Sequence, residues 1–253
     1  MPSKNNHNQR QNLDFSRFEF KYVLSRQSRE DVEAHLQYFV ELDAFVKTQP
    51  DNKYSVRSLY YDDAHYTAFH DKIDGLLHRR KFRIRTYNDS LSGKAPYFLE
   101  VKGRHNNLVF KHRTPIDGRE WLQNRGHNLT ESVTKHSIDS AVRRQFMHSF
   151  FRDHIKPVAL ITYQRRPYIS KFDPDFRITF DDSLKATNAD HLFPEGSSQF
   201  YDVISGYNVL EIKFNNHLPA WFHRIVQAQN LRRVSISKVC AGMETLGMAR
   251  DEA

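Results

Sequence analysis

The sequence predicts an α+β fold in which about eight antiparallel strands close into a barrel, with helices packed outside and a charged tunnel inside. Two observations predict it. About eight segments alternate apolar and charged residues with a period of two, which is typical of strands with one buried face. Other segments carry the apolar stripe of amphipathic helices, which would cover the apolar strand faces. About eight strands close into a barrel with a narrow interior that holds one ligand, and closure removes exposed edges.

Length and composition predict one domain behind a short polar tail. The chain has 253 residues, and barrels of this length are commonly one domain. Residues 1–14 have no apolar secretory segment, so we expect a disordered tail there and a single domain over residues 15–253. No run approaches 18 apolar residues, so we expect no membrane-spanning helix. The single cysteine, Cys240, excludes an internal disulfide and favours a reducing compartment, so we expect the cytoplasm.

The first elements follow from alternation and from capping residues. Residues 17–24 alternate as a strand with one aromatic and one charged face. Ser28 has the position of an N-cap and opens a helix. Residues 54–62 alternate again as a strand. Residues 64–74 form a short helix, which Gly75 ends.

The middle of the chain is expected to contain a strand hairpin and a helical region. Residues 79–88 and 97–104 alternate as strands, and the Ser, Gly and Pro of residues 88–96 join them as a hairpin loop. Residues 108–116 form a further strand. Most of residues 117–151 are expected to be helical, residues 141–151 most clearly.

The last third is expected to contain three strands followed by two helices. Residues 157–170, 176–182 and 207–215 alternate as strands. Pro219 lies at a helix N1 position, where its missing N–H costs nothing. Ser237 is the N-cap of the last helix.

The segment 79–87 shows why the charged faces should converge. Arg79, Lys81, Arg83 and Arg85 share one face, and four cations on one face repel each other unless water or an anion lies over them. A β-sandwich with its charged face in water would explain the alternation. It would not explain why nearly every strand has Arg or Lys at its middle, which favours the charged interior.

The predicted interior contains more cations than carboxylates. Unpaired buried charges are costly, so the surplus requires a polyanion, and the carboxylates suit Mg²⁺ or Mn²⁺, which prefer oxygen ligands. The expected cations are Lys21, Arg57, Arg79, Lys81, Arg83, Arg85, Lys102, Arg104, Lys111, Arg113, Arg165, Arg177 and Lys213, and the carboxylates are Glu19, Glu100, Asp181 and Glu211.

The balance of charge agrees with an anionic partner. A net charge of +8 fits nucleic acid, a membrane surface or a polyphosphate compound. Interleaved Arg and Tyr residues would suit single-stranded nucleic acid. The chain has no RNP, KH or zinc-finger signature, and cations inside a barrel could not reach a duplex, so we expect no nucleic-acid partner.

Seven short motifs together resemble a known family. In chain order they are Arg17-x-Glu19-x-Lys21-Tyr22, Ser58-Leu59-Tyr60-Tyr61-Asp62, Arg83-x-Arg85, Leu99-Glu100-Val101-Lys102, Arg177-Ile178-Thr179, Leu210-Glu211-Ile212-Lys213 and Ser237-Lys238. Each is weak alone, but the ordered set resembles the VTC-type polyphosphate polymerase domain of the CYTH-like triphosphate tunnel metalloenzyme superfamily. The resemblance extends from about Phe15 to Met248.

This resemblance implies a closed tunnel in which ATP donates its γ-phosphate to a growing inorganic polyphosphate chain. It also implies a bound Mn²⁺ or Mg²⁺ ion, held by Glu211 with Glu19 as a second candidate. The catalytic residues would be Lys21, Arg83, Arg85, Lys102 and Lys238. By the same pattern Lys111, Arg165 and Arg177 would bind phosphates, and the predicted interior adds Arg57, Arg113 and Lys213 to them.

One departure from the wider superfamily bears on the reaction. Hydrolase and cyclase members begin with Glu-x-Glu-x-Lys, whereas Arg17 stands here at the first position, which favours the polymerase branch. Two alternatives stay open. The same tunnel could hydrolyse tripolyphosphate or a nucleoside triphosphate with a metal-activated water, or it could bind polyphosphate or nucleotide without catalysis.

Overall fold

The computed structural model describes residues 17–91, 96–106, 108–117, 133–135, 137–138, 140–194, 198–215 and 217–251. The expected tail of residues 1–14, part of the expected 88–96 loop and most of the expected helical stretch before residue 133 lie outside these ranges.

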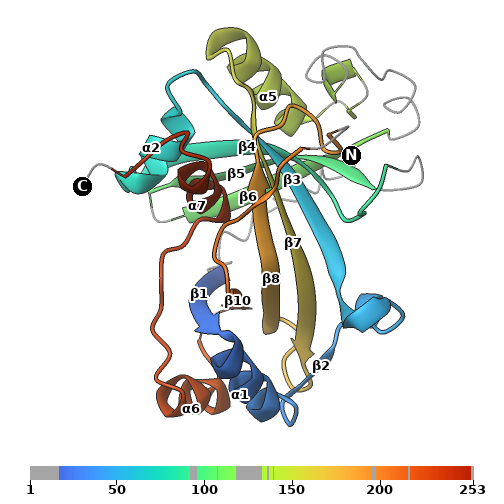
Figure 1. The fold of residues 1–253 in the computed structure, drawn as a ribbon, viewed down its shortest axis with the longest axis vertical. Coiled ribbons are helices and arrows are strands. Elements are labelled where there is room, and N and C mark those ends of the chain that lie inside the picture. Colours follow the sequence, from blue (N-terminus) through green and yellow to red (C-terminus); the bar gives the residue numbers. More distant parts are fainter. Residues whose placement is uncertain are drawn as a thin grey trace, which may run out of the picture.

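The described strands form one antiparallel sheet of ten strands in the order β1-β10-β8-β7-β3-β4-β5-β6, with β2 paired to β7 and β9 paired to β8 (Figure 1). All pairings are antiparallel. The strands are β1 (Arg17–Ser25), β2 (Val40–Leu42), β3 (Tyr54–Asp62), β4 (His78–Thr86), β5 (Tyr97–His105), β6 (Leu108–Ile116), β7 (Lys156–Ser170), β8 (Arg177–Thr187), β9 (Tyr201–Asp202) and β10 (Tyr207–Asn215).

The predicted closed barrel of about eight strands is wrong, because the sheet is open between β1 and β6. The free edge of β1 is occupied by the segment 232–236 instead of by β6. Tyr22 forms an isolated antiparallel bridge with Arg233, and the Val234 N–H donates to the Lys21 carbonyl at 2.9 Å. At Lys21 and Tyr22 the segment 232–236 therefore takes the position that a neighbouring strand would need.

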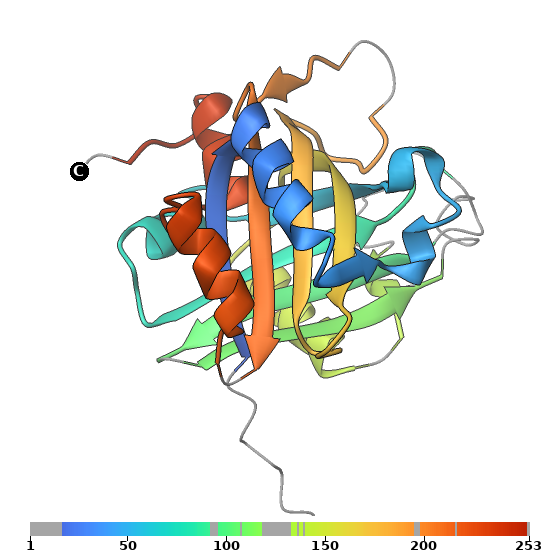
Figure 2. The ribbon, with the colours of Figure 1, turned by 90° about the horizontal axis from the view of Figure 1, so that it is seen from below.

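We call β1, β10 and β8 one wing of the sheet and β4, β5 and β6 the other. Helices cover the outer face of both wings, as the sequence predicts (Figures 1 and 2). The helix α1 (Arg26–Leu36) and the helix α6 (Ala220–Ala228) lie over β1, β10 and β8, where Leu36 and Phe222 join a buried cluster. The helix α5 (Ala141–Arg152) packs over β4, β5 and β6 through Phe146. In the described residues no helix is long and apolar enough to cross a membrane.

The helix α7 (Lys238–Thr245) departs from the prediction that helices pack outside, because it lies on the inner face of the sheet. A Cβ built at Gly242 would come within 2.4 Å of Ile161 Cδ1, so a larger residue here would require the Ile161 side chain or α7 to move. Ile161 pairs with Ser58, and Ser58 pairs with Arg85, which places Ile161 on the charged face. The Lys81 ammonium donates to Cys240 Sγ at 3.0 Å from the same face.

The remaining helices are short. The helix α2 (Thr67–Ile73) falls within the predicted 64–74 segment, and the 3-10 helices η1 (Ala44–Val46) and η2 (Pro50–Asn52) lie between β2 and β3. The predicted N-cap of α1 at Ser28 is wrong by three residues. Ser25 caps the helix by accepting from the Ser28 N–H at 3.1 Å, because β1 leads into α1 without a turn.

Candidate functional site

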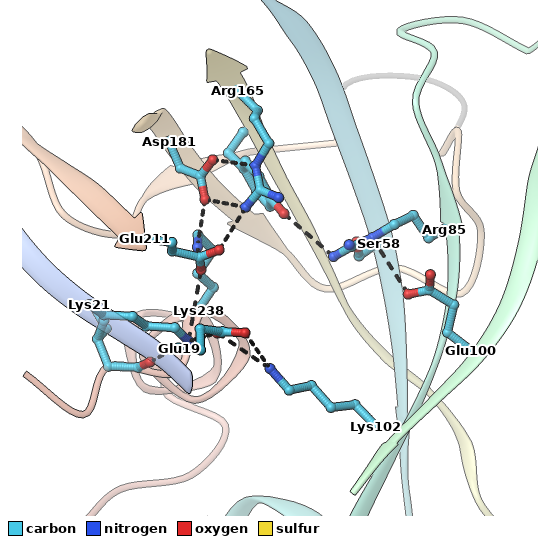
Figure 3. Close-up of polar contacts among 12 residues, drawn as sticks. Glu19, Lys21, Ser58, Arg85, Glu100, Lys102, Arg165, Asp181, Glu211 and Lys238 are labelled. Carbon is cyan, nitrogen blue, oxygen red and sulfur yellow. Dashed lines mark hydrogen bonds and ion pairs between the residues drawn. The ribbon is translucent and has the colours of Figure 1, made fainter. Parts of the chain in front are cut away.

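The sheet is curled so strongly that side chains of distant strands meet on its charged face. Glu19 on β1 and Lys102 on β5 lie far apart in the strand order, yet their side chains are 3.5 Å apart. Arg83, Glu100 and Arg113 are paired directly across β4, β5 and β6, so their side chains project to the same side. Curling therefore brings the charged side chains of both sheet wings together on one concave surface, which we call the inner face (Figure 3).

A buried acidic pair forms the first half of the site. Asp181 on β8 binds Arg165 through two contacts of 2.6 and 2.7 Å, and the same guanidinium donates to Glu211 at 2.9 Å. Lys238, the first residue of α7, contacts Asp181 at 2.7 Å and Glu211 at 2.5 Å. Burial favours the neutral acid, but Lys238 and Arg165 outweigh it and hold the pKa of Glu211 well below its usual range.

Lys21 connects the acidic pair of Asp181 and Glu211 to a further carboxylate, Glu19. Its ammonium lies 3.2 Å from Glu19 and 3.8 Å from Glu211, and it donates to the Ile236 carbonyl at 3.2 Å. Burial raises the pKa of Glu19, but Lys102 and Lys21 more than offset burial and lower it to about 2. Both glutamates are therefore carboxylates at neutral pH, and both face one ammonium.

An arginine cluster forms the second half of the site. Arg83 donates to Glu100 at 2.7 Å and to the Tyr60 hydroxyl at 2.8 Å. Arg85 donates to the Ser58 hydroxyl at 2.9 Å. Glu100 is fully buried, and burial raises its pKa, but Arg83 and Arg85 outweigh burial and lower it to about 2.

The arginine cluster also changes the acidity of a tyrosine. Burial alone would raise the pKa of Tyr60, but Arg83 and Arg85 stabilise the phenolate and lower it to about 8. The Lys111 ammonium approaches Glu100 at 3.0 Å from the neighbouring strand. The cluster is thus a set of three cations around one carboxylate, with a phenol at its border.

Lys213 and Arg177 extend the inner face beyond the acidic pair. They are paired directly across β10 and β8, and Arg177 is exposed. Burial lowers the pKa of Lys213 to about 8, although Glu211 raises it. Neither has a hydrogen bond or ion pair with another described residue, so both are available to an anion.

The structure places twelve of the thirteen predicted site residues around the two clusters or on the adjoining inner face. These are Glu19, Lys21, Arg83, Arg85, Lys102, Lys111, Arg113, Arg165, Arg177, Glu211, Lys213 and Lys238. Arg165 and Lys238 are already held by carboxylates, which fixes their position more than it leaves them open to a ligand.

Two predicted phosphate ligands, Arg57 and Arg113, make other contacts. Arg57 is on the outer face, where it donates to the Leu192 carbonyl at 2.9 Å and lies over the Phe193 ring. Arg113 is on the inner face, but its guanidinium stacks over Phe98 at 4.5 Å. The prediction that Arg57 lies in the charged interior is wrong, because β3 is buried or half-buried along its whole length and its two faces cannot be told apart by polarity.

Sequence reasoning also missed two polar contacts. Tyr60 and Ser58 orient Arg83 and Arg85, and both lie on the inner face opposite those arginines. Once the pairing of residues 54–62 with 79–87 is known, the register identifies them. Without the pairing, the tyrosines of β3 are typical packing residues.

The carboxylates of the site are candidate ligands for a hard divalent cation. No group of three potential metal ligands occurs in the part of the chain that the structure describes. Glu19 and Glu211 nevertheless face the same ammonium, and Mg²⁺ is usually held by one or two carboxylates together with substrate phosphates. This donor pair therefore fits a metal ion that arrives with a polyphosphate ligand.

Comparisons with known proteins identify the family and a similar fold. The family model described as the VTC domain matches residues 16–247, which is most of the chain. No curated protein matches the sequence. A crystal structure of a candidate adenylate cyclase from Bacillus halodurans superposes with a TM-score of 0.52 at 13% identity, covering 87% of this chain and 92% of that chain. At this identity the likeness shows the fold alone.

Proposed function

The chain belongs to the VTC domain family, and from this premise we propose that it transfers phosphoryl groups from ATP onto inorganic polyphosphate. The observation that carries the proposal is the surplus of positive charge on the inner face. Eight cations, namely Lys21, Arg83, Arg85, Lys102, Lys111, Arg165, Lys213 and Lys238, surround the four carboxylates of Glu19, Glu100, Asp181 and Glu211. Such a surplus is compensated when a polyanion binds.

Arg83 and Arg85 are the groups best placed to bind the terminal phosphates of ATP. A guanidinium has five N–H donors, and Arg83 uses only part of them on Glu100 and Tyr60. The remaining donors can bind phosphate oxygens, and arginine does this with two parallel hydrogen bonds. Lys111 is partly exposed and adds a third cation to this half of the site.

Lys21 and Lys102 lie where the two halves of the site meet. Both ammonium groups contact Glu19, and the carboxylate holds them in place without removing their charge. We assign them to neutralising the charge of the transferred phosphoryl group. Lys213 and Arg177, which have no partner among the described residues, would bind the acceptor chain.

Glu19 and Glu211 would hold the divalent ion, Mn²⁺ or Mg²⁺. Such an ion, when bound, neutralises phosphate oxygens and orients them. Lys238 and Arg165 keep Glu211 ionised and oriented toward the inner face, so both act as positioning residues for this carboxylate.

The transfer itself needs no general base. The bond between the γ-phosphorus and the β–γ bridging oxygen of ATP breaks, and ADP leaves with that oxygen. A terminal phosphate oxygen of the polyphosphate chain forms the new bond to phosphorus, and this oxygen is already ionised. Phosphoryl transfer depends mainly on positioning and charge neutralisation, which this set of side chains supplies.

We place the protein in the cytoplasm, where ATP is available. The free thiol of buried Cys240 supports a reducing compartment.

The decisive experiment incubates the chain with ATP and Mn²⁺ and follows the products by phosphorus NMR. We expect a growing signal of internal polyphosphate phosphates, lost in Glu211→Gln and kept in the matched control Glu30→Gln, whose side chain is 52% exposed on α1. Orthophosphate without a chain signal would identify a hydrolase instead. Binding of ATP without turnover would identify a binding module.

A further inference from the structure

A row of aromatic side chains continues the inner face beyond the arginine cluster. Phe45 contacts Tyr54, Tyr54 contacts Tyr87, and Tyr87 contacts Phe98, with ring centroids 5.4, 5.7 and 6.2 Å apart. Arg113 stacks over Phe98 at 4.5 Å. We call Phe45, Tyr54, Tyr87 and Phe98 the aromatic rim. They come from η1, β3, the residue that follows β4, and β5, which are brought together only by the fold.

Strand register places the aromatic rim directly next to the phosphate-binding cations. Phe98 is paired with Arg85 across β5 and β4, and Tyr54 is paired with Arg165 across β3 and β7. Tyr87 follows Arg85 by two residues, which is about 7 Å along an extended strand. The rim is therefore continuous with the site for the terminal phosphates and lies on the same face.

One end of the aromatic rim is exposed to solvent. Phe45 is 56% exposed, and Arg113 is exposed as well. Phe45 continues a row of contacting rings from the inner face to the surface, and contiguous aromatic surface of this kind is typical of ligand-binding sites. Outside the rim, both wings of the outer face are covered by helices, whereas no described helix covers Phe45.

We propose that the aromatic rim binds the nucleobase of the ATP that serves as phosphoryl donor, an inference that rests on the function proposed above. A nucleoside triphosphate carries its base, ribose and α-phosphate on one side of the phosphates that Arg83 and Arg85 bind. Lys102, assigned to the transferred γ-phosphate, is paired with Lys81 and so lies on the other side of Arg83 from Tyr87, which directs the base toward the rim. Arg113 beside Phe98 supplies a cation next to the expected position of the α-phosphate.

The rim recognises the base by stacking and not by hydrogen bonds to its edge. Every base has a π face, so stacking on aromatic side chains tolerates any sequence or base identity. The donor site should therefore accept purine nucleotides with similar affinity. Inorganic tripolyphosphate has no base and should bind through the cations alone.

The test measures binding by calorimetry, with Mg²⁺ present, for ATP, GTP and inorganic tripolyphosphate. Phe45→Ala and Phe98→Leu are each expected to weaken ATP and GTP about tenfold, which is typical of removing a base-stacking ring, and to leave tripolyphosphate unchanged. Tyr38→Ala is the matched control, because Tyr38 is a 68% exposed aromatic residue outside the rim. It should change none of the three affinities.

The outcomes separate this inference from the function on which it rests. Equal loss for all three ligands would mean that the rim only supports the fold, and unchanged ATP affinity in both variants would overturn the base site. Tripolyphosphate binding without ATP binding in the wild type would do the same while leaving the phosphate site intact. Failure of the wild type to bind any of the three ligands would overturn both proposals. Phe45 is exposed, so its variant stays informative if Phe98→Leu does not fold.

Discussion

Lys238 Nζ lies 2.5 Å from Glu211 Oε1, and this contact attaches the first turn of α7 to the middle of β10. The same ammonium lies 2.7 Å from Asp181 on β8. Burial lowers the pKa of Lys238, but the carboxylates of Asp181 and Glu211 stabilise its ammonium and raise the pKa above its ordinary value. One side chain thereby anchors α7 on the inner face and also fixes the carboxylate of the candidate metal site.

Removing the Lys238 charge should destabilise the protein strongly. Lys238→Met leaves two buried carboxylates with Arg165 as their main partner, and removing one partner of a buried ion pair costs about 3–5 kcal/mol. We expect the free energy of unfolding in urea to fall by about 3 kcal/mol. The control Lys185→Met, at a 46% exposed lysine, should change it by less than about 1 kcal/mol. Similar values for both variants would show that α7 does not depend on this contact.

Glu100 should restrain the phosphate affinity of the arginine cluster. Its carboxylate occupies donors of Arg83 and lies 3.0 Å from Lys111, so it competes with a bound phosphate for the same cations. We expect Glu100→Gln to bind inorganic tripolyphosphate several-fold more tightly and to unfold at lower urea concentration. Weaker binding in this variant would instead mean that Glu100 is needed to orient the arginines.

Alkaline pH should weaken nucleotide binding while the fold becomes more stable. Burial lowers the pKa of Lys213 to about 8, and Arg83 and Arg85 lower that of Tyr60 to about 8 against the burial that raises it. Above pH 8 each group loses a proton, so the inner face loses positive charge. The unfolded chain still binds both protons there, so the free energy of unfolding rises with pH between about 8 and 9.5.

The two trends can be measured separately. ATP affinity by calorimetry should fall between about pH 7.5 and 9.5, where the phosphates of ATP are already ionised. Urea unfolding over the same range should show no loss of stability. Lys213→Arg and Tyr60→Phe should each flatten part of the fall in affinity. A parallel loss of stability in the wild type would attribute the weaker binding to unfolding.

The strands could be predicted from the sequence because their outer face is apolar. Leu99 and Val101 alternate with Glu100 and Lys102, and the same period recurs in nearly every strand. Closure could not be predicted, because the edge of β1 is covered by the segment 232–236, where only Val234, Ser235 and Ile236 alternate, which is too short a run to indicate a strand. The inward position of α7 was equally hidden, since an amphipathic helix does not specify which sheet face it covers.

The site residues could be predicted on strands in which one face is charged and the other is apolar and buried. Arg83 and Arg85 alternate with the buried Phe82 and Ile84, so their direction follows from the period of two. In β3 this signal is absent. Both faces are covered there, one by the inner charged groups and one by the outer core, and Arg57 was therefore assigned to the wrong face.

Arg57 offers a direct check of that assignment. Its guanidinium donates to the Leu192 carbonyl and lies over Phe193, so it fastens the segment after β8 to the outer face. Arg57→Ala should leave tripolyphosphate affinity unchanged, whereas Arg83→Ala should reduce it by tenfold or more, because a charge-assisted hydrogen bond contributes about 1.5–3 kcal/mol. Arg57→Ala should also lower the free energy of unfolding by about 1 kcal/mol, through the lost hydrogen bond and ring contact. Equal loss of affinity in the two variants would return Arg57 to the phosphate site and contradict the register of β3.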